Sequence, residues 1–330
     1  MPKTTNLKKF RSAVKWILRV LLFQFILMNI SASLHAWKLT HFYTDPELRI
    51  IRPSSKNVFV KTWKLFAGIK FPRSLKNNAP QFPIDTVQFK TKNGLLIDCW
   101  YSKPDSAAKG TVILFHGLST NKNYFAYEAV QFHNWGYNIL MVDLRGHGNS
   151  EGNITTLGFR ESEEVKLAYD FVRQKGEKNI FLWGLSLGAV SIAKAISDYD
   201  IKPSGVILEM PFACLQSYLK ARSRVFGFPE EPFGFLVTAW VGIERGYYGF
   251  GHKVTDYVKK INCPVLLQWG SRDRYVLQEE TDGVYNNIAS VNKKLVVYED
   301  ADHQSLLRYD PEKWRQEVGA LLQHPGSVHP

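Results

Sequence analysis

Short apolar runs alternate with amphipathic stretches from about residue 84 to residue 323. The runs are rich in Val, Ile and Leu, as in buried strands, and apolar residues recur at helical spacing between them. After two strands around a hairpin turn at Lys92-Asn93-Gly94, the predicted strands are 111–117, 137–145, 179–186, 205–212, 264–270 and 293–299. This alternation favours a mostly parallel sheet with helices on both faces.

The alternation is interrupted once, between the predicted strands at 205–212 and 264–270. About fifty residues there contain no clear strand, although a crossover between parallel strands needs far fewer. Between residues 211 and 250, ten of 40 residues are aromatic, against 14% for the whole chain. We expect a cap at about 211–260, whose aromatic side chains either form its own small core or line a site for an apolar group.

The first 37 residues have the pattern of a membrane-targeting segment. Six basic residues in the first 19 positions precede the apolar run 20–30. As a helix, residues 16–37 would extend about 32 Å, enough to cross the hydrocarbon core of a bilayer. We expect residues 1–37 to be a retained signal anchor. A signal peptide cleaved near Ser31-Ala32-Ser33, which would leave a secreted protein, and a soluble amphipathic helix are the alternatives.

The net charge of +12 comes from the amino-terminal quarter of the chain. Residues 1–80 hold 15 Lys and Arg against 2 Asp and Glu, whereas residues 81–330 hold 27 against 28. A basic segment at 38–83 beside an anchor favours anionic lipid headgroups, and no recognition motif for nucleic acid accompanies it. Basic residues before the apolar run place the main domain, 84–330, on the non-cytoplasmic side of the membrane.

The pentapeptide GLSLG, residues 184–188, connects a predicted strand to a predicted helix. In a G-x-S-x-G turn, the small residues allow a sharp change of direction that exposes the serine at the carboxyl end of the sheet. The next helix directs its first N–H groups and its positive dipole end toward the same point. Ser186 is therefore the candidate nucleophile, and the N–H of Leu187 is the first candidate oxyanion donor.

A serine nucleophile requires a base, and the base requires an acid that orients it. Asp273 follows the predicted strand 264–270, and His303 follows the predicted strand 293–299. The chain order Ser186, Asp273, His303 is the order expected of this sheet topology. Three further carboxylates are too close to His303 in the sequence to reach its ring easily and are weaker substitutes for the acid: Glu299, Asp300 and Asp302.

A second oxyanion donor is expected from the loop after the strand 111–117, where we assign the N–H of Leu118. His116 precedes it in the same loop. Because His303 already fills the position of the base, we interpret His116 as an organiser of the loop.

Five segments together resemble the α/β-hydrolase fold, in the serine-hydrolase branch with monoacylglycerol-lipase-like and serine-aminopeptidase-like enzymes: HGLS, DLRGHGNSEG, GLSLG, GSRD and DADH. The resemblance covers roughly residues 84–323. It implies an eight-stranded sheet, a Ser-His-Asp triad, a cap after the sixth strand, and no metal or organic cofactor. It also implies that Asp143 and Arg145 serve folding, and it leaves the role of His147 open. The cysteines, Cys99, Cys214 and Cys263, lie far apart and indicate no zinc site.

These features predict a membrane-anchored serine hydrolase that cleaves a carboxylic ester, lipid and acyl esters included, through an acyl-enzyme. The motifs do not separate esters from thioesters or amides, so a thioesterase, a peptidase and an acyltransferase remain alternatives with the same triad. A binding module without catalysis is a further alternative, but the intact Ser, Asp and His positions argue against it.

Overall fold

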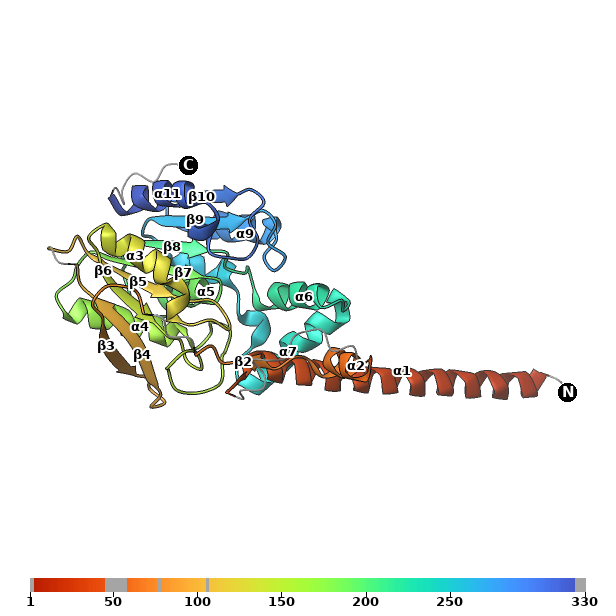
Figure 1. The fold of residues 1–330 in the computed structure, drawn as a ribbon. Coiled ribbons are helices and arrows are strands. Elements are labelled where there is room, and N and C mark those ends of the chain that lie inside the picture. The colour runs from red at the N-terminus through yellow and green to blue at the C-terminus, as the bar shows by residue number, and fades with distance from the viewer. Residues whose placement is uncertain (1–2, 45–57, 76–78, 105–106, 324–330) are drawn as a thin grey trace.

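The computed structural model describes residues 3–44, 58–75, 79–104 and 107–323 (Figure 1). Eight strands form one sheet in the order β10-β9-β8-β7-β5-β6-β4-β3, in which only β4 runs antiparallel to its neighbours. The strands are β3 (Asp85–Lys90), β4 (Leu96–Ser102), β5 (Thr111–Phe115), β6 (Asn138–Val142), β7 (Ile180–Leu185), β8 (Gly205–Glu209), β9 (Val265–Gly270) and β10 (Lys293–Tyr298). The predicted mostly parallel sheet and its hairpin are confirmed.

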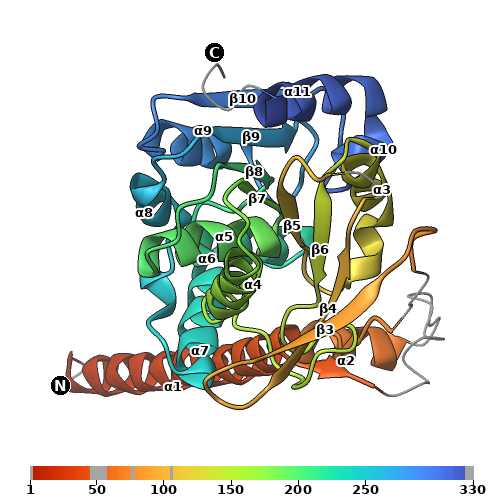
Figure 2. The ribbon, with the colours of Figure 1, turned by 90° about the vertical axis from the view of Figure 1, so that its left-hand side faces the viewer.

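The central strands, β5 to β9, are buried at every position, as expected of parallel strands covered on both faces. On one face, Phe132 and Trp314 are in edge-to-face contact, with ring centroids 5.5 Å apart. On the other face of the sheet, α5 lies in the middle and packs against α4 and α8 (Val254–Tyr257) (Figure 2). The helices around the sheet are α3 (Ala126–Asn134), α4 (Ser162–Gln174), α5 (Leu187–Asp198), α9 (Gln278–Asn287), α10 (Leu306–Tyr309) and α11 (Pro311–Gln323).

The predicted cap lies between β8 and β9, the sixth and seventh strands of the sheet in chain order. Its position is confirmed. The cap stands beside the end of the sheet where the strands finish, next to the amino-terminal helix (Figure 1). Its main helices are α6 (Leu215–Val225), α7 (Phe235–Arg245) and α8 (Val254–Tyr257).

The amino-terminal helix α1 (Lys3–Thr40) is one continuous helix of 38 residues, three residues longer at its end than the predicted anchor. Its stretch Lys8–Thr40 is long and apolar enough to cross a membrane. Side chains are exposed from Lys8 to Arg19 and from Leu21 to Leu27, and this part extends away from the rest of the protein (Figure 1). The helix therefore has an exposed half, basic at its start and apolar toward its middle, and a docked half.

The docked half of α1 packs against the cap helix α7 and the short helix α2 (Val58–Ala67). Ala32 and Ala36 are completely buried, so small side chains permit the close approach. Ser31 Oγ donates to Phe66 O at 2.6 Å, and Ser33 Oγ donates to Glu244 Oε1 at 3.1 Å. The small residues that suggested a cleavage site thus form a helix-packing surface.

The segment after α1 is joined to the main domain by backbone and side-chain hydrogen bonds. Phe42 N–H donates to Asn153 O of the main domain at 2.8 Å, and the strand β1 (Phe42–Tyr43) pairs in parallel with β2 (Phe71–Pro72) of the same segment. Arg73 donates to three carbonyl oxygens, those of Gly148 at 2.8 Å, Gly152 at 2.9 Å and Ser150. At least this basic side chain therefore binds the protein, although we expected it beside lipid headgroups. Residues 45–57 and 76–78 of the basic segment lie outside the described residues.

Candidate active site

Ser186 lies in a strained turn between β7 and α5. Its φ is 50° and its ψ is −110°, and its N–H donates to Glu209 O on β8 at 2.7 Å. A positive φ at a residue with a side chain costs on the order of 1–3 kcal/mol and persists only where the surroundings impose it. The turn therefore holds the serine in a fixed, unfavourable backbone conformation at the carboxyl end of the sheet.

The glycines on either side of Ser186 are required by close backbone contacts. A Cβ atom at Gly188 would lie 2.1 Å from Phe115 O, and one at Gly184 would lie 2.6 Å from Ala189 N. Neither space admits a methyl group without a backbone shift. The G-x-S-x-G pattern thus allows α5 to start directly against β5.

Replacing Gly188 with alanine is expected to destabilise the protein by about 3 kcal/mol or more, because the contacting atom belongs to a central strand and cannot move freely. The matched control is Gly283→Ala in α9, where the new Cβ would meet only Thr255 Cγ2, at 3.9 Å. That change is expected to be neutral or stabilising by about 1 kcal/mol. Chemical denaturation measures both; equal stabilities for the two variants would contradict the steric argument.

His303 and Asp273 are joined by a short hydrogen bond. His303 Nδ1 and Asp273 Oδ2 lie 2.6 Å apart, and the Asp273 side chain is completely buried. The other carboxylate oxygen, Oδ1, accepts from the N–H groups of Tyr275 at 2.8 Å and Val276 at 3.0 Å. The carboxylate is therefore fixed on both sides and can hold the imidazole in one orientation.

Two of the carboxylates considered as alternatives to Asp273 make other contacts. Asp300 pairs with Arg272 at 2.7 Å, and Asp302 Oδ1 accepts from the backbone N–H of His303 at 2.9 Å. Among the described carboxylates, the one that contacts the imidazole is thus Asp273.

A pocket of about 230 Å³ brings the candidate residues from separate loops together. No hydrogen bond joins Ser186 to His303 within the described residues, but both side chains line this pocket. Also in its wall are Leu118, Tyr218, Arg222 and Tyr275. Across the described ranges, no group of His, Cys, Asp and Glu could hold a metal ion.

Two backbone N–H groups are available beside the serine. The loop after β5 passes close to it, since a Cβ at Gly117 would lie 3.8 Å from Ser186 Cβ. Leu187 is the first residue of α5, so its N–H has no acceptor inside the helix. In the part of the chain described, the N–H groups of Leu118 and Leu187 make no hydrogen bond. Both N–H groups therefore belong to the turns next to Ser186 and have no acceptor among the described residues.

Two buried histidines organise the loops around this site. His116 Nε2 accepts from Leu144 N–H at 3.0 Å, and His147 Nε2 accepts from Ser119 N–H at 3.3 Å. His147 Nδ1 also lies 2.9 Å from Arg145 O, to which it donates. Burial lowers the pKa of His116 to about 4 and that of His147 to about 3, so both are neutral at pH 7. His147, whose role the sequence left open, thus positions the loop that carries Leu118.

Asp143 binds neighbouring backbone and side-chain groups. Its Oδ1 accepts from Lys122 N–H at 2.7 Å, and its Oδ2 accepts from Lys122 Nζ at 2.5 Å and from Asn149 N–H at 2.9 Å. These bonds hold the segment that follows β6, which agrees with the folding role implied by the resemblance.

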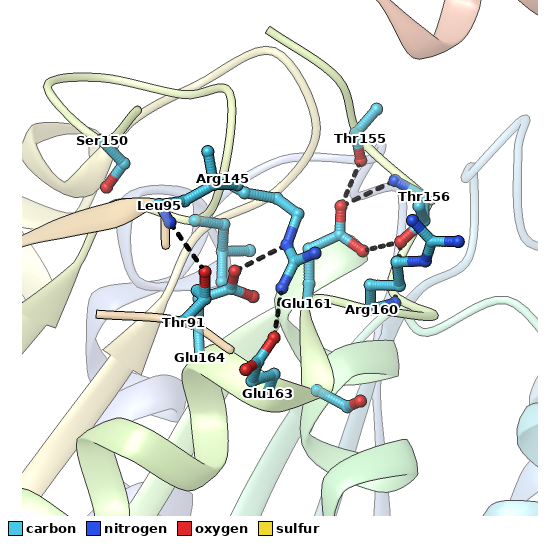
Figure 3. A network of polar contacts seen from close by, with 12 residues as sticks. Thr91, Leu95, Arg145, Ser150, Thr155, Thr156, Arg160, Glu161, Glu163 and Glu164 are labelled. Atoms are coloured by element: carbon cyan, nitrogen blue, oxygen red, sulfur yellow. Dashed lines mark hydrogen bonds and ion pairs between the residues drawn. The ribbon is translucent and has the colours of Figure 1, made fainter. Parts of the chain in front are cut away.

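Arg145 is the centre of a second polar network (Figure 3). Its Nε donates to Glu164 Oε1 at 2.6 Å, and its Nη2 donates to Glu163 Oε2 at 3.0 Å. Glu161, drawn beside it, accepts four hydrogen bonds from the turn 155–158. The hydrogen bonds of Arg145 and these carboxylates connect the loop before α4 with the start of that helix. None of these residues lines the serine pocket.

Sequence reasoning missed several pocket residues, notably Phe71, Arg222 and Tyr275. Phe71 belongs to a two-residue strand in the segment expected to be juxtamembrane, and such a strand has no periodic pattern. Arg222 lies on the cap helix α6, whose orientation over the pocket depends on tertiary packing. Only the aromatic content of the cap indicated that this region contacts the site.

Comparisons with known proteins agree with this geometry. The family model described as serine aminopeptidase, S33, matches residues 106–233. Uncharacterized protein YqkD of Bacillus subtilis is 26% identical over 217 residues, 64% of this chain and 70% of that protein. Lysophosphatidylserine lipase ABHD12 of Danio rerio is 26% identical over 187 residues, 54% of this chain and 47% of that protein.

Among solved structures, the esterase Pf2001 of Pyrococcus furiosus superposes with a TM-score of 0.65 and 26% sequence identity. The alignment covers 76% of this chain and 96% of the esterase. The strand order, the position of the cap and these matches lead to the same assignment. The chain has the α/β-hydrolase fold, and the proteins to which it is similar include one named as an esterase and one named as a lipase.

Proposed function

We propose that the protein is a membrane-anchored serine hydrolase that cleaves a carboxylic ester with Ser186, His303 and Asp273. The observation that carries the proposal is the Asp273–His303 hydrogen bond of 2.6 Å at a pocket that also contains the strained serine. A serine, a histidine and a carboxylate thus lie at three loops of one sheet edge, which supports the assignment of nucleophile, base and orienting acid. The relatives named as an esterase and a lipase favour an oxygen ester as the substrate.

In this mechanism, His303 Nε2 takes the proton from Ser186 Oγ as the oxygen attacks the ester carbonyl carbon. Asp273 keeps the other proton on Nδ1 and stabilises the imidazolium that forms. The N–H groups of Leu118 and Leu187 donate to the oxyanion of the tetrahedral intermediate. The imidazolium then protonates the leaving alcohol, and water, activated by the same histidine, releases the acid from the acyl-enzyme.

A fluorophosphonate probe tests this part of the proposal. The probe forms a bond from phosphorus to an activated serine oxygen and loses fluoride. We expect label on the peptide that contains Ser186 in the detergent-solubilised protein. Folded protein that takes up no label would contradict the activated serine. Product analysis with and without an added alcohol then separates hydrolysis from acyl transfer.

Retention of the amino-terminal helix as an anchor is supported by its two halves. The exposed half carries large apolar side chains between Trp16 and Leu27, and the docked half packs at Ala32 and Ala36 against other helices. Cleavage near Ser31-Ala32-Ser33 would remove or expose this packed surface. The basic residues before the apolar run favour a main domain on the non-cytoplasmic side.

Removing the exposed half is expected to release the protein from membranes without unfolding it. A chain that begins at Met28 keeps the packed residues Ser31, Ala32 and Ala36, so its main domain is expected to retain esterase activity. After an alkaline wash, the full-length protein is expected in the membrane pellet and the shortened chain in the supernatant. A mature full-length protein whose first residue follows Ser33 would instead demonstrate cleavage.

A further inference from the structure

A second, predominantly apolar pocket of about 300 Å³ lies between the amino-terminal helices and the cap. Its volume is at the lower end of the range for small-ligand pockets. Helix α1 contributes Leu39, α2 contributes Leu65, and the cap contributes Leu219, Phe228, Phe233 and Val237. The proposed catalytic steps do not involve this pocket, so the reason for its apolar lining lies elsewhere.

The apolar pocket adjoins the serine pocket. Phe71 and Arg222 line both of them, which places these two side chains at the junction. The Arg222 guanidinium lies over the ring of Phe71 at 5.2 Å and over that of Tyr275 at 5.9 Å, and Tyr275 itself contacts His303 with ring centroids 5.6 Å apart. A ligand that extends from the apolar pocket past this junction therefore reaches the proposed catalytic residues.

The surface around the apolar pocket is suited to a bilayer. Helix α2 lies alongside α1 (Figure 1), and His35 Nε2 of α1 is 2.8 Å from Leu65 O of α2. On α2, Phe59 is 85% exposed and Trp63 is 61% exposed. Large apolar side chains on the outside of this short helix, next to a helix that can span a membrane, indicate contact with lipid.

We propose that α1 and α2, together with the cap, form the binding site for the acyl chain of a membrane lipid ester, which enters from the bilayer and places its carbonyl carbon at Ser186. This inference rests on the proposed hydrolase function. It gives the amino-terminal helices a part in substrate binding as well as attachment. One acyl chain is the occupant because most of the lining side chains are apolar, the volume is about 300 Å³, and the pocket shares Phe71 and Arg222 with the pocket of the single proposed nucleophile.

A bifunctional probe tests the location of the chain in the unmodified protein. The probe is a fluorophosphonate with a hexadecyl chain that ends in a diazirine, applied to the full-length protein in detergent. After reaction at Ser186 and illumination, we expect cross-links to peptides from residues 31–40 or 58–71. Label at Ser186 with cross-links only to other regions would overturn the acyl-site proposal, whereas no label at Ser186 would count against the hydrolase itself.

Two substitutions on α2 provide a second, independent measurement. Leu65→Trp places a larger side chain in the pocket wall, and Val60→Trp makes a similar change on the same helix at a residue that does not line the pocket. We expect Leu65→Trp to lower the ratio of kcat/KM for the palmitate ester to that for the butyrate ester by about tenfold. Butyrate hydrolysis reports that the variant is folded. An unchanged ratio, or an equal decrease in Val60→Trp, would contradict the assignment.

Discussion

Replacing Ser186 with alanine is expected to reduce kcat for a short-chain ester by at least about 10⁴-fold. The serine oxygen is the only proposed nucleophile, and the oxyanion donors alone cannot replace it. The fold is expected to persist, because the Ser186 backbone N–H, not its side chain, bonds to β8. Hydrolysis of p-nitrophenyl butyrate and the thermal midpoint, measured on the same preparation, check the two statements.

The matched control is Ser191→Ala, five residues further along the chain, within α5. Ser191 is buried and donates to Leu187 O at 2.7 Å, so it resembles Ser186 in residue type and burial but does not line the pocket. We expect turnover in this variant to be close to that of the wild type. Full activity in Ser186→Ala would remove the serine from the mechanism, and a large loss in both variants would indicate a general disturbance of α5.

Replacing Asp273 with asparagine is expected to lower kcat by about 10⁴-fold while keeping the loop in place. Oδ1 accepts from two backbone N–H groups, those of Tyr275 and Val276, and an amide NH₂ cannot accept these bonds. The asparagine oxygen must therefore remain at that position, which turns the NH₂ group toward His303 Nδ1. The imidazole then has to accept at Nδ1 and carries its proton on Nε2, where it cannot act as the base.

The measurement is a comparison of kcat at several pH values together with fluorophosphonate labelling rates. A histidine in the wrong tautomer slows both reactions, since each begins with loss of the serine proton. Asp300→Asn serves as the control, because Asp300 is exposed and pairs with Arg272 outside the pocket. If Asp300→Asn were the more severe change, the acid would be misassigned.

The sheet and the candidate triad could be predicted from sequence because each rests on a local signal. Strand β7 is a short apolar run, and the positions of the two glycines around Ser186 have no room for a side chain. The G-x-S-x-G pattern in the sequence is therefore a direct result of the close backbone contacts at this turn. Asp273 and His303 could be proposed because residues after neighbouring parallel strands meet at one sheet edge.

The contribution of the amino-terminal quarter could not be predicted in the same way. An apolar run predicts burial in either lipid or protein, and α1 has an exposed half with large apolar side chains and a half packed on the cap. Small residues such as Ala32 suit both a cleavage site and close helix packing. Arg73 was counted only as positive charge, yet its hydrogen bonds to three carbonyl oxygens depend on a contact between distant parts of the chain.

The uninterrupted course of α1 also limits how the proposed anchored enzyme can move. A linker between a membrane span and a soluble domain would let that domain tumble and sample many heights above the lipid. Here the same helix continues from its exposed half into its packed half, with no break between Lys3 and Thr40. The serine pocket is thereby held in a fixed position relative to the exposed half of α1, and each residue inserted into the helix would displace it by about 1.5 Å and turn it by about 100°. If the exposed half of α1 spans the membrane as proposed, the length of the helix sets the distance between the bilayer and the serine pocket.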